Sequence, residues 1–489
     1  MIFRKVNFVL ILSLLFVIPS VAQNFNDALL LSEPGIYNNA RALGMGNSYT
    51  ALSNDFSSVI FNPAGLGLAK KLGISGGIDL NSFDNTASFL GNNTISTQNE
   101  VNLSQVGFVY PVPTIKGSMV FALGYNRVKN FNGIVQFDGF NNSNTSMIQF
   151  LTGDFNEEVP ITNDLGLSYE VRNPQTDEYI RDTTRINGQL NQSGKVKSKG
   201  NIGNWSFAGS IEIAKDLYVG GTFNIVSGNY KRNRDYYEDD TKDIYGANTE
   251  LVPGDVTTKD FQTFYFNDII DWDLSGWDFK LGLLYDWENF VKFGATVKFP
   301  TYYTVKESYF ATGESEFGSG SNFAVDPPII DNVQYDIRTP YEYSAGASVN
   351  LVILTVSGEA KLIDYTQMEF TKGLGQQYRI EKNKEIDDLF RTAVTYNLGA
   401  EMKVPSLPVW GRAGAMYIQS PFKDDPSDFD KKYLTAGVGV KLGRVFSIDF
   451  GYAYGWWKTF TDNYGSGVSR VQHDVTVQNV VLTISTALN

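Results

Sequence analysis

The chain has 489 residues, a formal net charge of −13, no cysteine and a single histidine, His473. These values exclude a disulfide-stabilised scaffold and any metal centre built from cysteine or several histidines. The acidic balance argues against nucleic-acid binding, which needs a clustered basic surface. Length alone would suggest two or three domains, but no linker or composition break divides the chain. We therefore expect one large unit that carries no cofactor.

The first residues have the pattern of an export signal. Arg4 and Lys5 form a short basic region, Val6 to Ile18 an apolar core, and Ser20-Val21-Ala22 a small-residue cleavage site, which predicts a signal peptide over 1–22. The apolar core is shorter than the roughly 20 residues that a membrane-spanning helix needs. No later segment is as long and apolar, so membrane insertion would have to use strands.

Fourteen later segments alternate with the period of two that is typical of strands. They lie near 72–80, 101–110, 118–128, 202–214, 216–229, 276–287, 290–304, 341–350, 352–363, 391–402, 409–418, 433–442, 445–457 and 474–486. The connections between them alternate strictly between long and short, as long extracellular loops and short periplasmic turns do in a transmembrane barrel. The sequence therefore predicts an all-β fold, an antiparallel barrel of 14 strands over 72–489.

The alternation gives the predicted wall an apolar face and a polar face. In one segment the apolar set is Phe446, Ile448, Phe450, Tyr452, Tyr454 and Trp456, and the other set is Ser447, Asp449, Gly451 and Gly455. Trp287, Trp410, Trp456 and Trp457 lie near segment ends, where interfacial girdles place aromatic residues. We therefore expect the apolar face to meet lipid and the polar face to line the lumen.

Between the signal and the strands lies a stretch rich in small residues, Asn39 to Lys70. It contains two glycines, the small segment 51–53, an acidic residue and a proline turn, namely Gly44, Gly46, Asp55, Asn62, Pro63 and Ala64. Small residues allow close backbone approach, and the proline fixes a defined turn. This pattern resembles the N-terminal hatch of the FadL/TodX family of outer-membrane transporters for long-chain fatty acids and other hydrophobic compounds. The resemblance implies a hatch over 23–71 that lies inside the barrel.

The resemblance also implies a function and a location. A monomeric barrel in the bacterial outer membrane, in contact with its lipid, would take up a hydrophobic small molecule passively, with gating by the hatch and exit through the wall. In the family an irregular third strand makes the wall opening, which here would be at Gly124 and Asn126. Some barrels of this type instead receive exported proteins in a secretion system, and segment 129–201 is large enough to dock such a partner. An open porin would need an unplugged lumen.

Three inward-facing cations are candidates for holding a carboxylate in the lumen: Lys280, Lys361 and Arg412. A charge-assisted hydrogen bond holds an anion well in a partly apolar cavity. The same three residues could instead pair with Glu359 and Asp449 across the lumen, and we favour that pairing.

Other polar groups give weaker indications. His473-Asp474 has no serine marked as a nucleophile, so we expect no catalytic residues and no enzyme. An acidic loop that contains Asp424, Asp425, Asp428 and Asp430 matches no calcium-loop template, so we expect no metal site.

Overall fold

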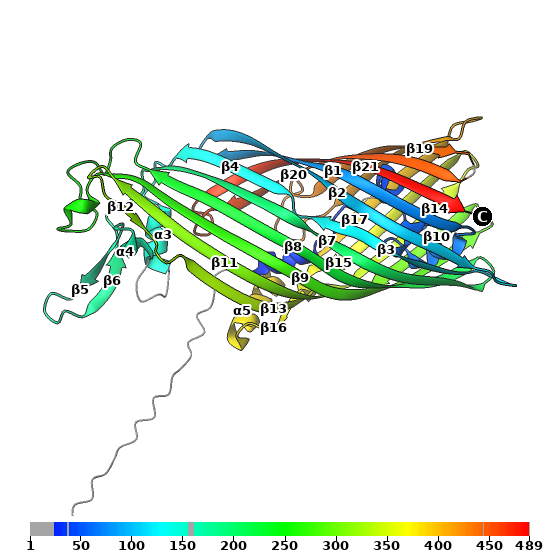
Figure 1. Ribbon diagram of the computed structural model, residues 1–489, viewed down its shortest axis with the longest axis horizontal. Helices are drawn as coiled ribbons and strands as arrows, with labels where there is room; N and C mark the ends of the chain where they lie inside the picture. The colour runs from blue at the N-terminus through cyan, green and yellow to red at the C-terminus, as the bar shows by residue number, and fades with distance from the viewer. Residues whose placement is uncertain (1–23, 37–38, 155–160, 444, 489) are drawn as a thin grey trace, which may run out of the picture.

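The computed structural model describes residues 24–36, 39–154, 161–443 and 445–488, so the predicted signal peptide lies outside the described residues. Most of the chain forms one antiparallel sheet that closes on itself, because β1 pairs with both β2 and β21 (Figure 1). The ring is thus closed, although some strand edges within it are paired over only part of their length. The prediction of a 14-strand antiparallel barrel is confirmed.

Ten of the wall strands are single elements, and four are built from two consecutive elements. The single ones are β1 (Leu72–Phe89), β2 (Asn92–Val112), β7 (Asn191–Ala214), β8 (Leu217–Asp239), β9 (Phe261–Trp287), β17 (Thr392–Lys403), β18 (Val409–Ile418), β19 (Lys431–Leu442), β20 (Phe446–Asp462) and β21 (Arg470–Leu488). The composite ones are β3 (Met119–Asn130) with β4 (Gly133–Phe140), β10 (Val291–Lys298) with β11 (Tyr302–Phe317), β13 (Ile329–Arg338) with β14 (Glu342–Asn350), and β15 (Leu354–Asp364) with β16 (Glu369–Lys372).

Two of the composite strands are interrupted at a proline. Pro300 lies between β10 and β11, and Pro340 lies between β13 and β14. A proline has no backbone N–H to donate to a ladder, so a strand that contains one breaks there. The neighbouring strand β9 spans the first break, since it pairs with β10 on one side of Pro300 and with β11 on the other.

Several strands are longer than predicted on the side of the long loops. The structure starts β7 at Asn191 and β9 at Phe261, and it ends β8 at Asp239. The predicted loops in these places are therefore partly strand. The added residues are paired in the ladder, but their outward side chains are polar, as at Lys195, Lys197 and Lys199. In β9 the alternation persists with the opposite facing, since Trp272 and Leu274 are buried inside whereas Asp273 is exposed, so a search for an apolar outer face does not identify the extension.

The two faces of the wall are as predicted. Phe446, Phe450 and Tyr454 are exposed on the outside, whereas Gly451 is buried against Ala40. Exposed apolar side chains recur at alternate positions on other strands of the wall, for example Trp277, Leu281 and Leu283 on β9. Among the described residues, no helix combines the length and the apolarity that crossing a membrane requires.

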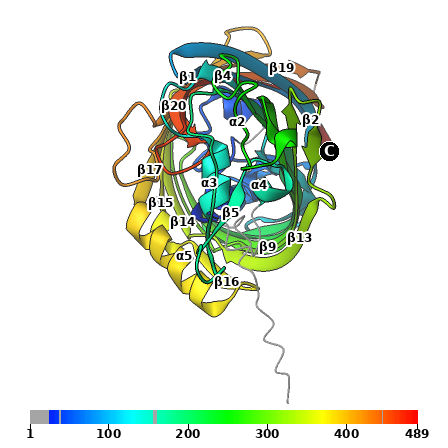
Figure 2. The ribbon, with the colours of Figure 1, turned by 90° about the vertical axis from the view of Figure 1, so that its left-hand side faces the viewer.

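The described part of the predicted hatch lies inside the barrel. It contains α1 (Phe25–Ser32), α2 (Ala40–Gly44), and the 3-10 helices η1 (Phe56–Val59) and η2 (Pro63–Leu68). The view along the barrel shows α2 within the ring of strands (Figure 2). Its side chains pack against the inner wall, where Ala40 and Leu43 contact Met416, Tyr433, Ala453 and Val481. The lumen is therefore filled by the chain's own N-terminal segment.

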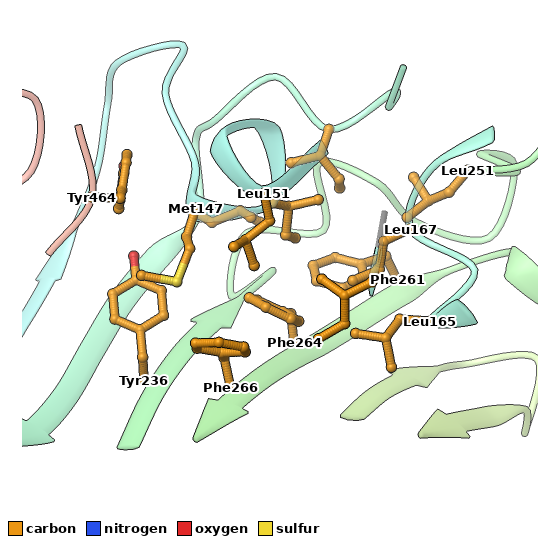
Figure 3. Close-up of a cluster of buried hydrophobic side chains, with 14 of the residues drawn as sticks. Met147, Leu151, Leu165, Leu167, Tyr236, Leu251, Phe261, Phe264, Phe266 and Tyr464 are labelled. Carbon is orange, nitrogen blue, oxygen red and sulfur yellow. The ribbon is translucent and has the colours of Figure 1, made fainter. Parts of the chain in front are cut away.

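The end of the barrel away from the short turns has its own cap. Helices α3 (Met147–Asp154) and α4 (Ile161–Asp164) lie across this end (Figure 2). Met147, Leu151 and Leu165 pack there with Phe264 and Tyr236 in a buried cluster (Figure 3). The N–H groups of Met147 and Ile148 donate to the buried carboxylate of Glu238 on β8. A carboxylate at a helix N-terminus is stabilising, so Glu238 anchors this cap to the wall.

The remaining elements lie outside the ring or along its rim. They are the hairpin β5 (Tyr169–Arg172) and β6 (Tyr179–Thr183), the short strand β12 (Asn322–Ala324), the 3-10 helices η3 (Val256–Thr258) and η4 (Tyr365–Gln367), and the helix α5 (Gln376–Leu389). The hairpin projects beyond the barrel end (Figure 1). The helix α5 lies against the outside of the wall (Figure 2).

The assignment of the two faces predicts unequal costs for placing an arginine on them. Phe450→Arg should lower the free energy of unfolding by roughly 2 to 4 kcal/mol, because it puts a charge into lipid. Ser447→Arg, on the lumen side of the same strand, should cost far less. Refolding titrations into lipid vesicles measure both. Equal costs would contradict the assignment.

Candidate transport site

The turn at Asn62-Pro63-Ala64 fastens the hatch to the wall. The side-chain amide of Asn62 donates to the carbonyl of Thr50 at 2.9 Å and to that of Leu283, on β9, at 3.0 Å. Its oxygen accepts from the N–H of Ala64 at 3.1 Å, which caps η2. One buried side chain thus joins two parts of the hatch to each other and to the barrel.

The other predicted hatch residues form a helix cap, a positive-φ turn and a close backbone contact with the wall. Asp55 caps η1 by accepting from Ser57 N–H at 2.9 Å, and it accepts from the Tyr49 hydroxyl at 3.1 Å. Gly46 has φ +61°, a conformation that glycine adopts without strain. The Cα of Gly44 lies close to Gly437 of the wall.

Four pairs of wall glycines receive the hatch, and within each pair the two glycines lie opposite each other on adjacent strands. The pairs are Gly107 with Gly124, Gly220 with Gly282, Gly399 with Gly414, and Gly437 with Gly451. A Cβ added at any of these eight positions would lie no more than 3.1 Å from an atom of the hatch. The ring of Phe56 lies over the first pair, and Asn62 and Pro63 lie over the second. The hatch is therefore docked directly on backbone.

The predicted lumen cations are all engaged with carboxylates or with the hatch. Arg412 pairs with Glu401 and with Asp449, each at 2.6 Å. Lys280 donates to the carbonyl of Ile60, and Lys361 lies 3.6 Å from Glu342. Glu359 was a proposed partner for these cations, but it accepts instead from the N–H groups of Tyr49 and Thr50, at 3.0 and 2.9 Å.

A cavity of ≈320 Å³ lies farther along the strands from the short turns than the glycine pairs do. Aromatic and aliphatic side chains line much of it, including Phe83, Phe131, Tyr433 and Trp457. Polar side chains line the rest, which are Asn81, Arg127, Lys129, Asn130, Asn132, Ser198, Lys431, Asn479 and Glu33. Small-molecule sites combine apolar walls with a small number of placed polar groups, and this lining is more polar than that, because four of its side chains, Glu33, Arg127, Lys129 and Lys431, are charged.

The segment 30–36 separates this cavity from a smaller one of ≈50 Å³, which Lys280 and the hatch residues Val59 and Ile60 line. Two lysines of the larger cavity hold this segment. Lys431 contacts both carboxylate oxygens of Glu33, at 3.0 and 2.9 Å, and Lys129 donates to backbone carbonyls of Leu30 and Glu33. Burial acts to raise the pKa of Glu33, but Lys431 and Lys129 outweigh it and hold that pKa below its ordinary value. These lysines were not among the predicted site residues.

Beside the cavity, the backbone ladder of the wall is interrupted. Strand β2 pairs with β3 only from Gln105 to Val112, opposite Asn126 to Met119. Over 92–103, β2 pairs with β1, but none of the described residues pairs with its other edge. We call this stretch the ladder break. The chain shifts register between Arg127 and Lys129, and β4 then pairs with β7 alone.

Side chains cross the ladder break in place of backbone hydrogen bonds. The amide of Gln98 donates to Asn132 and to the carbonyl of Ser198, and Ser96 donates to the carbonyl of Ile134 at 3.3 Å. Gly124 lies within the regular ladder under Phe56, and Asn126 is its last paired residue on the β2 side. A buried ion pair between Asp79 and Arg127 lies next to the break.

The histidine and the acidic loop have structural partners. His473 lies between Asn85 and the hydroxyl of Thr461, at 3.2 and 2.9 Å. Asp430 accepts from Tyr417 and from the N–H of Ser420. Within the described ranges, no three histidine or acidic side chains gather in a group that could hold a metal ion.

Known proteins resemble this chain in structure and not in sequence. No family model and no curated protein matches the sequence. A FadL homologue from Pseudomonas aeruginosa is similar in structure at 10% identity and a TM-score of 0.58, over 94% of this chain and 100% of that one. The chain has the FadL/TodX fold.

Two other solved structures support the same fold. The Pseudomonas putida toluene transporter TodX has 13% identity and a TM-score of 0.52, over 92% of this chain and 98% of that one. The CymD monoaromatic hydrocarbon channel has 14% identity and a TM-score of 0.51, over 93% and 98%. The apolar outer belt agrees with this fold, that of a barrel whose outer face meets lipid.

The glycine pairs predict that a single methyl group loosens the hatch. Gly282→Ala should push Asn62 away from β9 and raise hydrogen exchange across 39–71, while the barrel still migrates as a folded species on an unheated gel. The matched control is Gly76→Ala, because a Cβ there meets nothing within 4 Å. Identical exchange in the two variants would contradict the direct docking.

Proposed function

We propose that this chain takes up hydrophobic small molecules, such as long-chain fatty acids or aromatic hydrocarbons, across the outer membrane by passive diffusion. The observation that carries the proposal is the position of the ≈320 Å³ cavity, which shares Asn132, Gly133 and Ser198 with the edge of the ladder break. The likeness to a toluene transporter and to a hydrocarbon channel supports it at the level of the fold.

The proposed route follows the chemistry of the lining. A hydrophobic solute enters beneath the cap of α3 and α4, occupies the cavity, and leaves sideways between β2 and β4 into lipid. This route lets an apolar molecule return to hydrocarbon without crossing bulk water. The bonds across the break are made by side chains such as Gln98 and Ser96, which rotate more readily than a backbone ladder.

The hatch is the proposed gate on the periplasmic side. Within the hatch, Val59 and Ile60 line the smaller cavity together with Glu33 of segment 30–36, and this segment also borders the substrate cavity. A shift of this segment would change the shape of both cavities.

A receptor for exported proteins is the alternative function, and segment 129–201 was its main support. The described part of this segment forms β4, α3, α4, the β5–β6 hairpin and the start of β7. Helices α3 and α4 bury their apolar side chains in the barrel's own cap, so these two helices offer little surface to a partner.

Weakening the hatch turn tests the proposed gate. Asn62→Ala removes both bonds to Thr50 and Leu283, and Pro63→Gly frees φ, so both should alter uptake of radiolabelled oleate and toluene by proteoliposomes. The wall is held by strand pairing, so the protein should remain heat-modifiable on gels. Leakage of a small hydrophilic dye would identify the hatch as a stopper only. Wild-type uptake in both variants, with an intact barrel, would contradict the proposed gate, and an absence of uptake by the wild-type protein would contradict the function.

A further inference from the structure

The turn that joins β14 to β15 presents three exposed apolar side chains at the short-turn end of the barrel. They belong to Leu351, Val352 and Ile353, and Val352 is 90% exposed. Val352 also has φ +67°, in the left-handed region that a β-branched residue rarely adopts. Glycine and asparagine are the usual residues at such a position, and both suit water better than valine does. The turn thus carries an apolar side chain where neither the backbone nor water favours it.

The tips of the two adjacent hairpins extend this apolar surface. Asn350 donates its N–H to the carbonyl of Phe290 at 2.8 Å, and Phe290 is exposed. On the other side, Lys403 donates its N–H to the carbonyl of Ile353 at 2.8 Å, and Leu407, in the turn between β17 and β18, is exposed. We define the tip patch as Phe290, Leu351, Val352, Ile353 and Leu407.

Two tryptophans on β9 mark the two edges of the apolar belt. Trp277 and Trp287 are both exposed, and Leu281 and Leu283 are exposed between them. At a strand tilt of about 40°, the ten residues from Trp277 to Trp287 span roughly 26 Å of height. The apolar band of a transmembrane barrel is about 25 Å tall and ends in an aromatic girdle on each side. Trp287 therefore marks the membrane interface at the short-turn end.

The row of paired residues that starts at Trp287 climbs away from the short turns as it crosses the wall. Its members lie zero, one, three, six and eight residues from the short-turn end of their strands, at Trp287, Val349, Ala400, Ala436 and Val480. Strands that tilt by about 40° produce such a climb, which is roughly 3 Å per strand.

Val352 therefore lies close to the height of Trp287. Two strands of climb place Val349 roughly 6 Å above Trp287, and the chain descends by about 8 Å from Val349 to Val352. On the outward face of β14, every second residue from Tyr343 to Val349 is apolar. The apolar belt thus continues into the tip patch, which lies level with the interfacial girdle.

We propose that the tip patch inserts into the lipid leaflet on the short-turn side of the membrane, at the boundary between acyl chains and headgroups. The inference rests on the membrane location that the proposed function requires. Burial of the patch in lipid offsets the unfavourable backbone conformation of Val352. Other short turns end in polar residues, such as Lys215 between β7 and β8, whose side chain is 91% exposed. The patch would therefore anchor one sector of the barrel's short-turn end in lipid.

Site-directed spin labelling measures the depth of the tip, and it needs only single cysteines because the native chain has none. Val352→Cys is labelled in the full-length protein in phospholipid vesicles. The matched control is Lys215→Cys, because both side chains are almost fully exposed at the tips of short turns. The readout compares collisions of the label with oxygen, which concentrates in lipid, and with a water-soluble nickel chelate. The ratio of oxygen to nickel collisions should be several-fold higher at position 352 than at position 215.

A third variant, Val438→Cys, reports a site on the lipid face of β19, where Val438 is exposed. A ratio at position 352 as low as that at position 215, with a high ratio at position 438, would overturn the anchor and leave the membrane location of the barrel intact. Few collisions with either reagent at position 352 would indicate cover by a second copy of the chain and would also overturn the anchor. A low ratio at position 438 would contradict the membrane location itself, and the anchor with it.

Discussion

In the hydrocarbon of a membrane, an unpaired backbone N–H or C=O costs several kcal/mol, so a sheet can cross only when every edge is paired. This constraint explains the closure of β1 on β21 over a long register, from Leu72 with Leu488 to Ser88 with Gln472. It also explains why a departure from pairing is informative. The ladder break beside β2 is such a departure, and side-chain amides and hydroxyls take over the bonding there.

The same closed wall has to accommodate the hatch. The wall glycines solve this problem by omitting side chains where the hatch backbone makes contact, as at Gly399 against Met45 and Gly451 against Ala40. The hatch contributes its own polar ties, of which Asn62 to Leu283 is the clearest. Hatch and wall are thus fitted to each other. The two lysines that contact segment 30–36, Lys129 and Lys431, line the cavity that remains farther along the strands.

The sequence was sufficient to predict the strands that meet lipid, because alternation of apolar and polar residues reports burial against hydrocarbon. It was also sufficient for the turn at Asn62 and Pro63, where residue chemistry determines local geometry. The extensions of β8 and β9 beyond the membrane could not be predicted, since their outward residues, such as Asp271 and Asn233, are polar. The cap helices α3 and α4 are short, and their packing against Phe264 depends on distant strands.

The candidate site was harder to predict than the fold. Lys431 contacts the carboxylate of Glu33 and Lys129 contacts its backbone carbonyl, and this convergence depends on barrel register across 302 residues of sequence, the separation between the two lysines. The pairing of Gly220 with Gly282 likewise cannot be predicted unless the register between β8 and β9 is known. In contrast, the lumen cation Arg412 was recognised from strand alternation alone, because the side on which a residue lies is a local property. Local chemistry was therefore predictable, and convergence of distant residues was not.

The central claim is that solute leaves the barrel through the ladder break. Because the native chain has no cysteine, Gln98→Cys and Asn132→Cys can be combined and joined by a short, reducible thiol cross-linker. The account predicts that cross-linking abolishes oleate and toluene uptake by proteoliposomes and that reduction restores it. A control pair in the intact ladder, Ser227→Cys with Ser275→Cys, should transport normally when cross-linked. Full uptake by the quantitatively cross-linked Gln98 and Asn132 variant would contradict the account.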